Sequence, residues 1–473
     1  MFAPSGIRGL EEVVSGLPKN GLILVAGNPG TGKTIFSAGF IYSGITKYGE
    51  KGVYASIAED RETFYQEMSE LGYDFESLEK KGMFRFLNLI TLLEEGTSTI
   101  IGEILNAVES LEAKRLVIDP FSAISQAFKD PREVRVFLHT FLSKVVKRLG
   151  CTTILIGEIP FGKETIGYGF EEFVADAVII LKNLRFEDKL IREIRILKMR
   201  GAEVRNPDLC FTLHGGFRVM PPFRYSAFKA VKKLEPPSDP PNAYSTGIPD
   251  LDEAIGGYPK GSTVMLEVDS KVQSQEYRLI VGSVIADFVL KGRPCLCIPS
   301  AGTTWKEIPE NLKNWHKIGE EESSQLIRIF TLKERGDKNT PSYVIPWSPR
   351  DLEKSYEFFL RIEEELVKKH GKQALKMIGI DSIIHYFGED GAMSLANLEA
   401  ARQKYTGGLA LWLAKPIYPE VVSRIKPLSD VHLKFTRKHG CLLLYGVKPR
   451  TPLYAVEMDT SKGYVLPKLT PMV

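Results

Sequence analysis

Residues 22–34 read LILVAGNPGTGKT, in which an apolar run leads directly into the pattern G-x-x-x-x-G-K-[ST] at residues 27–34. An amphipathic segment follows, because apolar residues recur at helical spacing at Ile35, Phe36, Phe40, Ile41 and Ile45. A strand, a glycine-rich loop and a helix in this order are typical of a phosphate-binding loop, where backbone N–H groups converge on phosphate oxygens. The sequence therefore predicts ATP or GTP as a ligand.

The residues of this loop have separate expected roles. Lys33 is expected to reach the β- and γ-phosphate oxygens, and the hydroxyl of Thr34 is expected to bind Mg²⁺. The other predicted nucleotide-binding residues are Gly27, Asn28, Pro29, Gly30, Thr31 and Gly32.

Apolar strand candidates alternate with helical stretches through the first half of the chain, at residues 21–26, 52–57, 115–119, 152–156 and 178–181. This alternation predicts an α/β fold with a mainly parallel sheet flanked by helices. In open sheets of this kind, ligands bind beyond the carboxyl ends of the strands. The residues that directly follow each strand are therefore the candidates for chemistry.

Two carboxylates stand at such strand ends. Asp119 closes the run RLVID and is expected to hold Mg²⁺ opposite Thr34. Glu59 follows VYASIA and is expected to orient the water that attacks the γ-phosphoryl group. Asp60 is the rival for this catalytic role, and an ordinary helix N-cap is the alternative for either Glu59 or Asp60.

The beginning of the chain is repeated in its second half. Residues 5–27 align without gaps with residues 246–268, which matches Gly6 with Gly247 and Leu10 with Leu251, and also pairs the Pro-Lys steps at 18–19 and 259–260. Continuing this register places Ser274 at Lys33 and Gln275 at Thr34, so the repeat lacks a phosphate-binding loop. An internal duplication with one nucleotide site per chain is predicted.

The domain organisation follows from this repeat. We expect a nucleotide-binding domain over residues 1–220, a Pro-rich linker over 221–244 and a degenerate domain of the same fold over 245–473. The length of 473 residues suits two domains, since single cores stop growing at roughly half that size.

Charge, cysteine content and the lack of long apolar runs bear on partners and on the compartment. The chain has 62 basic and 59 acidic residues, a net charge of +3 that does not itself indicate nucleic acid or an anionic membrane. Five cysteines without disulfide or zinc spacing favour a reducing compartment, and Cys295 and Cys297 are interpreted as a packed pair. No signal peptide or membrane-length apolar run is seen. We expect a cytoplasmic protein that does not enter a membrane.

Several motifs together resemble one family. GNPGTGKT, the strand that leads to Glu59, IDPFSAI around Asp119, GYGFEEFVADAVIIL at residues 167–181 and LKMRG at residues 197–201 are similar to the KaiC-type ATPases of the RecA superfamily, which include archaeal KaiC-like and GvpD-like proteins. The resemblance covers the first domain and, more faintly, the second. It implies two tandem RecA-like domains and a ring-shaped homo-oligomer, a hexamer or pseudo-hexamer, with nucleotide between subunits. It also implies that Lys198 and Arg200 form a finger directed at the γ-phosphate of a neighbouring subunit.

Departures from the family pattern are informative. Relatives often carry adjacent glutamates after the second strand, whereas this chain has Ala58 before Glu59, so slow hydrolysis is expected. The second domain keeps Asp381 at the position of Asp119, and Lys448 and Arg450 at the positions of the finger. These two cations either complete a site of the first domain or remain from the duplication.

Three functions follow as hypotheses. The favoured one is an ATPase that acts as a nucleotide-dependent regulatory switch or assembly, with a regulatory protein partner. The second is a recombination or repair mediator whose ATPase is stimulated by DNA, although its candidate basic contacts form no aromatic-interleaved stripe: Lys129, Arg132, Arg135, Lys163, Lys229, Lys232 and Lys233. The third is an interaction scaffold that holds ATP between subunits without turnover.

Overall fold

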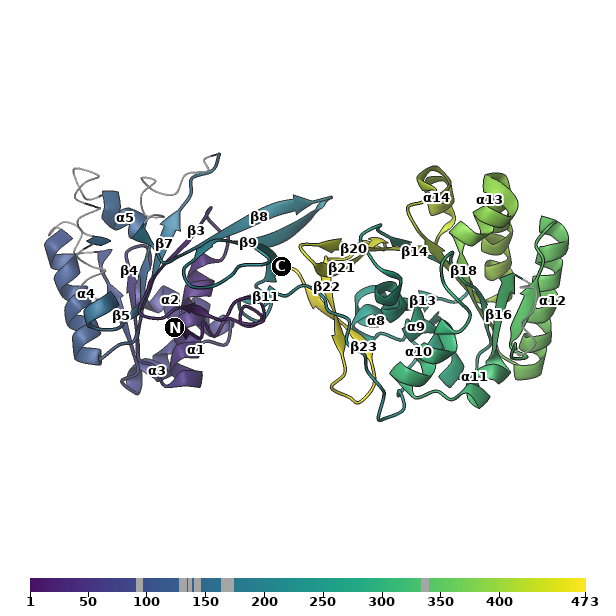
Figure 1. Ribbon diagram of the computed structural model, residues 1–473, viewed down its shortest axis with the longest axis horizontal. Coiled ribbons are helices and arrows are strands. Elements are labelled where there is room, and N and C mark those ends of the chain that lie inside the picture. Colours follow the sequence, from purple (N-terminus) through teal and green to yellow (C-terminus); the bar gives the residue numbers. More distant parts are fainter. Residues whose placement is uncertain (91–96, 127–133, 135–137, 140–145, 163–173, 333–339) are drawn as a thin grey trace. The chain divides into compact units, whose positions relative to one another are not determined.

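The computed structural model describes the chain except residues 91–96, 127–133, 135–137, 140–145, 163–173 and 333–339 (Figure 1). The chain divides into two compact units. Unit 1 consists of residues 1–222, 439–441 and 471–473, and unit 2 consists of residues 223–438 and 442–470. Each unit is an α/β body with its own sheet.

Over the described residues, unit 1 contains a nine-stranded sheet in the order β11-β10-β9-β8-β3-β7-β6-β4-β5. The ladders from β5 through β4, β6, β7 and β3 to β8 are parallel, and those from β8 to β11 are antiparallel. The strands are β3 (Leu22–Gly27), β4 (Gly52–Ser56), β5 (Phe84–Asn88), β6 (Arg115–Asp119), β7 (Thr152–Glu158), β8 (Ala177–Phe186), β9 (Lys189–Met199), β10 (Asp208–Thr212) and β11 (Arg218–Met220), with a separate pair β1 (Phe2–Ala3) and β2 (Leu17–Pro18).

Helices cover both faces of this sheet. They are α1 (Lys33–Tyr48), α2 (Arg61–Glu70), α3 (Phe75–Lys80), α4 (Thr97–Leu111) and α5 (Phe121–Gln126). Side chains of β3 alternate between the faces, since Ile23 packs with Phe40 of α1 and Leu24 packs in the cluster that contains Ile104 of α4. The apolar run before the loop is therefore buried on both sides, as a central parallel strand requires.

Unit 2 contains a ten-stranded sheet in the part of the chain that the structure describes, in the order β17-β16-β15-β18-β19-β14-β20-β21-β22-β23. The ladders from β17 to β20 are parallel. The strands are β14 (Ser262–Val268), β15 (Cys295–Ile298), β16 (Ile327–Leu332), β17 (Val344–Trp347), β18 (Leu375–Gly379), β19 (Leu409–Ala414), β20 (Val431–Lys438), β21 (Cys441–Lys448), β22 (Tyr454–Asp459) and β23 (Leu466–Pro471), with a separate pair β12 (Ala243–Tyr244) and β13 (Tyr258–Pro259).

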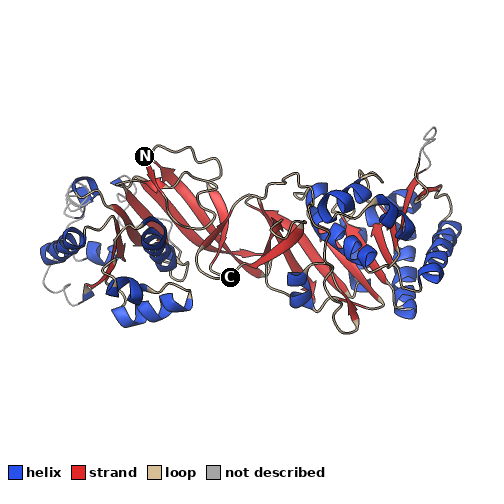
Figure 2. Cartoon of the chain, turned by 90° about the horizontal axis from the view of Figure 1, so that it is seen from below, coloured by secondary structure: helices blue, strands red, loops and turns tan. Residues whose placement is uncertain are grey.

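The helices of unit 2 also lie on both faces of its sheet (Figure 2). They are α8 (Pro249–Ile255), α9 (Ser274–Leu290), α10 (Glu307–His316), α11 (Glu320–Leu326), α12 (Leu352–His370), α13 (Ile380–Thr406), α14 (Pro419–Ile425) and the short 3-10 helix η3 (Lys426–Leu428). Residues of α9 and α10 pack in one core cluster, and residues of α12 and α13 pack in the other.

The two sheets share one strand order. The strands can be compared outward in both directions from β3 and from β14. Each strand described in unit 1 has a counterpart in unit 2 at the same place in the sheet and in the chain, and among the described residues only β17 has none in unit 1. The predicted fold class, two tandem α/β bodies with mainly parallel sheets flanked by helices, is confirmed. The sequence did not predict the antiparallel strands β9 to β11. Only the LKMRG segment, which overlaps the end of β9, had been singled out there.

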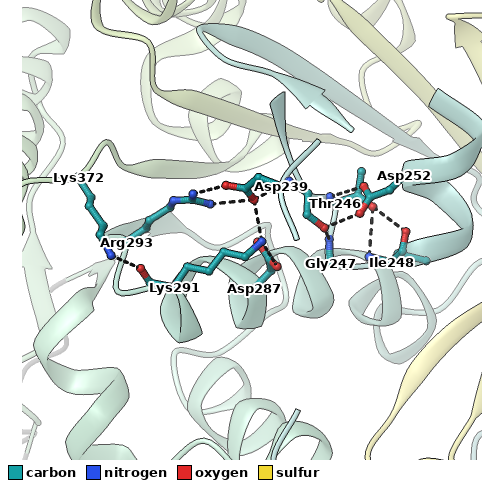
Figure 3. Close-up of polar contacts among 10 residues, drawn as sticks. Asp239, Thr246, Gly247, Ile248, Asp252, Asp287, Lys291, Arg293 and Lys372 are labelled. Carbon is teal, nitrogen blue, oxygen red and sulfur yellow. Dashed lines mark hydrogen bonds and ion pairs between the residues drawn. The ribbon is translucent and has the colours of Figure 1, made fainter. Parts of the chain in front are cut away.

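The Pro-rich segment expected as a linker is attached to unit 2. It has no helix or strand before β12, yet Ala230 and Leu234 are buried in the unit 2 core. Asp239 accepts hydrogen bonds from Lys291, at 2.7 Å, and from Arg293 (Figure 3). Residues 223–241 are therefore held along the surface of unit 2 and are not a free spacer.

A buried carboxyl group, that of Asp287, lies beside Asp239, Lys291 and Arg293. The Asp287 side chain is 0% exposed and its carboxylate lies 2.7 Å from the ammonium group of Lys291. The pKa of Asp287 is raised to about 7, mainly by burial and to a smaller extent by the charge of Asp239, against the opposing effect of the cations Lys291 and Arg293. In the folded chain this group therefore keeps its proton to a higher pH than in the unfolded chain.

We expect the stability of unit 2 to fall as pH rises from about 4 to about 7. Over this range the unfolded state loses the Asp287 proton and the folded state keeps it, so the free energy of unfolding decreases by at most about 1.4 kcal/mol per pH unit. Asp287→Asn should flatten this slope, and Asp390→Asn, which removes an exposed carboxylate, should leave it unchanged. Denaturant unfolding followed by tryptophan fluorescence reports on unit 2, because Trp305, Trp315, Trp347 and Trp412 all lie there. An unchanged slope in Asp287→Asn would contradict the assignment.

Candidate nucleotide-binding site

The glycine-rich loop joins β3 to α1 at the carboxyl edge of the unit 1 sheet. Gly30 and Gly32 have φ angles of 74° and 92°, a conformation that favours glycine. Gly32 is the N-cap of α1, no side chain caps this helix, and its first turn contains no acidic residue. The positive end of the α1 dipole is thus left for an external anion, which is the arrangement that binds phosphate.

Lys33 and Thr34 begin α1 and face the strand ends. The Lys33 ammonium group donates to the carbonyl oxygen of Asn28 at 2.9 Å, and Lys33 is only 9% exposed. Burial lowers the pKa of Lys33, while the charges of Glu158 and Asp119 act in the opposite direction. Lys33 therefore lies between the loop backbone and two carboxylates.

Asp119 lies at the end of β6, where it meets Thr34 across the sheet edge. The Thr34 hydroxyl donates to Oδ2 of Asp119 at 2.9 Å, and the Tyr54 hydroxyl donates to the same oxygen at 2.6 Å. Burial raises the pKa of Asp119, and the two hydroxyl hydrogen bonds and Lys33 oppose that rise. A carboxylate and a hydroxyl held together are hard oxygen donors that suit Mg²⁺. The residues expected to hold the metal are thus adjacent, with Tyr54 as a second support that the sequence did not indicate.

Glu59 and Asp60 follow β4 but differ in role. Asp60 is the N-cap of α2, because its carboxylate accepts the N–H of Thr63 at 2.9 Å. Glu59 is half-buried, and its pKa is raised by burial and by the charges of Glu67, Asp119 and Asp60. Asp60 therefore has the helix N-cap role that was the alternative for both residues. Glu59 is the carboxylate whose pKa is raised by the charge of Asp119.

Sequence reasoning missed a third carboxylate, Glu158. It ends β7, which extends two residues beyond the expected strand, and it pairs in register with Gly27 at the start of the loop. Its carboxylate accepts the Ser122 hydroxyl at 3.3 Å. A carboxylate at the end of an apolar strand was the available signal, the same signal that singled out Asp119.

Two further polar residues contact the loop from β8 and β9. Asn183 and Arg192 both donate to the carbonyl oxygen of Gly30, at 3.3 and 3.1 Å, and they bond to each other at 2.9 Å. Burial lowers the pKa of Arg192. These contacts place a cation beside the loop that no sequence motif had marked.

Lys198 and Arg200 lie away from this site within their own chain. Arg200 follows the end of β9, and its guanidinium group pairs with Asp176 at 2.9 Å. The other oxygen of Asp176 accepts the N–H of Leu22, the first residue of β3. Since the loop begins at the opposite end of β3, five residues and roughly 16 Å away, Arg200 does not reach the phosphates of its own subunit.

In unit 2 the corresponding positions are occupied by the protein's own charges. Glu276 forms a capping box at the start of α9, accepting the N–H of Gln273 at 2.8 Å, and pairs with Arg437. Asp381 accepts the Ser300 hydroxyl at 2.6 Å and lies 3.7 Å from the ammonium group of Lys415. A carboxylate at the N-terminus of α9 repels phosphate, so this arrangement disfavours nucleotide binding at the start of α9.

Two other sequence candidates have partners within unit 2. Lys448 donates to the carbonyl oxygen of Ser429 at 2.8 Å, and Lys233 pairs with Glu322. The candidate DNA contacts Lys129, Arg132, Arg135 and Lys163 lie outside the described residues. Cys295 and Cys297 are buried free thiols, and no cluster of metal-ligating His, Cys, Asp or Glu side chains occurs among the residues with described positions. Within the same residues, no helix is long and apolar enough to cross a membrane.

The fold and the loop together define a RecA-like protein with a phosphate-binding loop. Residues 3–222 match the family model described as "ATPase: KaiC". The chain is 30% identical to the UPF0273 protein PH0284 of Pyrococcus horikoshii over 213 residues, 42% of this chain and 85% of that protein. The chain therefore belongs to the KaiC-like family of RecA-type ATPases.

Other relatives are similar over a smaller share of their length. The circadian clock oscillator protein KaiC of Parathermosynechococcus lividus is 32% identical over 263 residues, 54% of this chain and 47% of that protein. The chain thus spans about half the length of the KaiC proteins it matches. The crystal structure of the KaiC-like protein PH0186 from Pyrococcus horikoshii is 34% identical and covers 47% of this chain and 99% of its own, with a TM-score of 0.42.

Proposed function

We propose that unit 1 binds ATP with Mg²⁺ and hydrolyses it slowly, and that the chain works as a nucleotide-dependent regulatory switch with one active site. The contact between Thr34 and Asp119 beside the uncapped start of α1 carries this proposal. It joins a place for phosphate to a pair of oxygen donors for a metal.

The expected chemistry is in-line attack of water on the γ-phosphoryl group. Thr34 and Asp119 would hold Mg²⁺, which when bound neutralises charge on the phosphates. Lys33 exchanges its contact with Asn28 for the β- and γ-phosphate oxygens. Glu59 orients the attacking water and accepts its proton, a role helped by its raised pKa.

We also propose that the chain acts as a homo-oligomer, in which Lys198 and Arg200 reach the nucleotide of a neighbouring copy. The position of Arg200 near the amino end of β3 supports this, since it cannot serve its own loop. Two cations directed at the γ-phosphate would stabilise the charge that develops during transfer. A ring closed in this way would couple nucleotide state to assembly and to a regulatory protein partner.

The test is ATP turnover by the whole chain with Mg²⁺ or with EDTA, each with and without single- and double-stranded DNA. We expect slow turnover that requires Mg²⁺ and does not respond to DNA. Stimulation by DNA would instead support a recombination or repair mediator. Bound ATP without turnover would support a scaffold held together by nucleotide.

A further inference from the structure

Two strands of the unit 1 sheet carry side chains that contact the nucleotide loop from outside it. β8 pairs with β3 as far as Leu181, which lies opposite Gly27, and Asn183 follows two residues later on the same face of β8. Arg192 of β9 lies directly opposite Asn183 in the β8–β9 ladder. The two side chains are therefore neighbours beyond the end of β3, where the loop leads to α1.

Both side chains donate to one backbone oxygen of the loop. The Asn183 amide and the Arg192 guanidinium group lie 3.3 and 3.1 Å from the carbonyl oxygen of Gly30. The guanidinium group also donates to the side-chain oxygen of Asn183 at 2.9 Å, so the two donors hold each other in place. A carbonyl oxygen has two lone pairs, so these two donors meet its full capacity.

Gly30 has the conformational freedom to turn this carbonyl group elsewhere. Its φ angle is 74°, and glycine takes positive and negative φ with similar ease. A Cβ atom at this position would meet nothing within 4 Å, so no neighbouring atom restricts it closely. The preceding Pro29 has no N–H group with which to anchor the turn. The two hydrogen bonds to the Gly30 oxygen therefore supply a constraint that the space around Gly30 does not.

The direction of this carbonyl group decides the direction of a loop N–H group. In a planar trans peptide, the C=O of Gly30 and the N–H of Thr31 point in opposite directions. With the oxygen held by Asn183 and Arg192, the N–H of Thr31 faces away from them. Among the residues with described positions, no acceptor is found for the N–H groups of residues 30–34, which suits a loop that binds phosphate oxygens. A rotated peptide would present an oxygen to the phosphates in place of a donor.

We propose that Asn183 and Arg192 are positioning residues for the triphosphate, which hold the Gly30–Thr31 peptide so that the N–H of Thr31 faces the phosphates. This inference rests on the proposed nucleotide site of unit 1 and adds to it two residues from outside the loop. The N–H contact is made in the ground state and in the transition state alike. Its loss should therefore raise KM for ATP and leave kcat nearly unchanged.

The test is binding of a fluorescent ATP analogue with Mg²⁺, beside steady-state turnover, by the whole chain carrying Asn183→Ala, Arg192→Met or both. Each single variant keeps one donor to Gly30, so its affinity should fall about two- to tenfold, the range of one net hydrogen bond. The double variant should lose more than the product of the two single losses, because only then is the peptide free to rotate. In all three, kcat should stay within about threefold of the parent.

The matched control is Arg185→Met, two residues after Asn183 on β8. The Arg185 guanidinium group donates to the carbonyl oxygen of Glu187 in the hairpin turn, so this variant should bind the analogue like the parent. Circular dichroism checks that each variant is folded. A direct attraction between the Arg192 charge and the phosphates would shrink as salt screens it, whereas positioning predicts the same loss of affinity in Arg192→Met at low and at high salt.

The outcomes separate this inference from the proposed function. Parental affinity in the double variant, with binding impaired in Lys33→Ala, would overturn the inference and leave the nucleotide site standing. So would a fall in kcat larger than the rise in KM, or a loss in Arg192→Met that disappears at high salt. Parental binding by Lys33→Ala, or no binding by the parent, would remove the proposed site and this inference together.

Discussion

Lys33→Ala should lower ATP turnover by the whole chain roughly 10²–10³-fold, the effect of removing one preorganised donor to developing charge. Its ammonium group lies beside the loop, between the carbonyl of Asn28 and the carboxylates of Glu158 and Asp119. The fold should persist, because the described contact of this group is a single hydrogen bond to the loop and the substitution removes a charge that is costly to bury.

The matched control is Lys47→Ala, an exposed lysine in the last turn of the same helix. Steady-state release of phosphate at saturating Mg²⁺ and ATP measures both variants, and circular dichroism checks that α1 is kept. Lys47→Ala should turn over ATP like the parent. Turnover by Lys33→Ala equal to that of the parent would show that this loop is not the site.

Glu59→Gln should reduce turnover on the order of 10²-fold and leave ATP binding nearly unchanged. Glutamine keeps the size of the side chain but cannot accept a proton from water. Binding measured with a fluorescent ATP analogue, beside turnover, separates this effect from loss of affinity. A glutamine variant with parental turnover would reject Glu59 as the base.

Two neighbouring carboxylates serve as comparisons. Asp60→Asn retains an N-cap side chain, so it should change neither turnover nor stability much. Asp60→Ala removes the cap and should lower the free energy of unfolding by about 1 kcal/mol. Glu158→Gln tests the carboxylate that pairs with Gly27 in the sheet. If Glu158→Gln abolishes turnover and Glu59→Gln does not, the catalytic role moves from β4 to β7.

Features that depend on residues close together in the chain could be predicted from the sequence. The loop, its helix and the strand that ends at Asp119 could be predicted because an apolar run, glycines and a terminal carboxylate stand close together in the chain. The contact between Thr34 and Asp119 spans 85 residues, yet it was foreseeable because parallel strands present their carboxyl ends at one edge.

The features that were missed depend on which strands are neighbours. Arg192 meets Gly30 across 162 residues, and Asn183 meets it across 153, and both lie in parts of β8 and β9 outside the quoted motifs. Tyr54 reaches Asp119 only because β4 lies beside β6.

We propose that unit 1 alone binds nucleotide, because Glu276 stands at the start of α9 in unit 2 and Lys415 pairs with Asp381, the counterpart of Asp119. The most direct measurement is the number of molecules of a non-hydrolysable ATP analogue bound per chain with Mg²⁺, in the parent and in Lys33→Ala. We expect one analogue per chain in the parent, and a large loss of affinity for it in the variant. Two analogues per chain, or one bound equally tightly without Lys33, would contradict it.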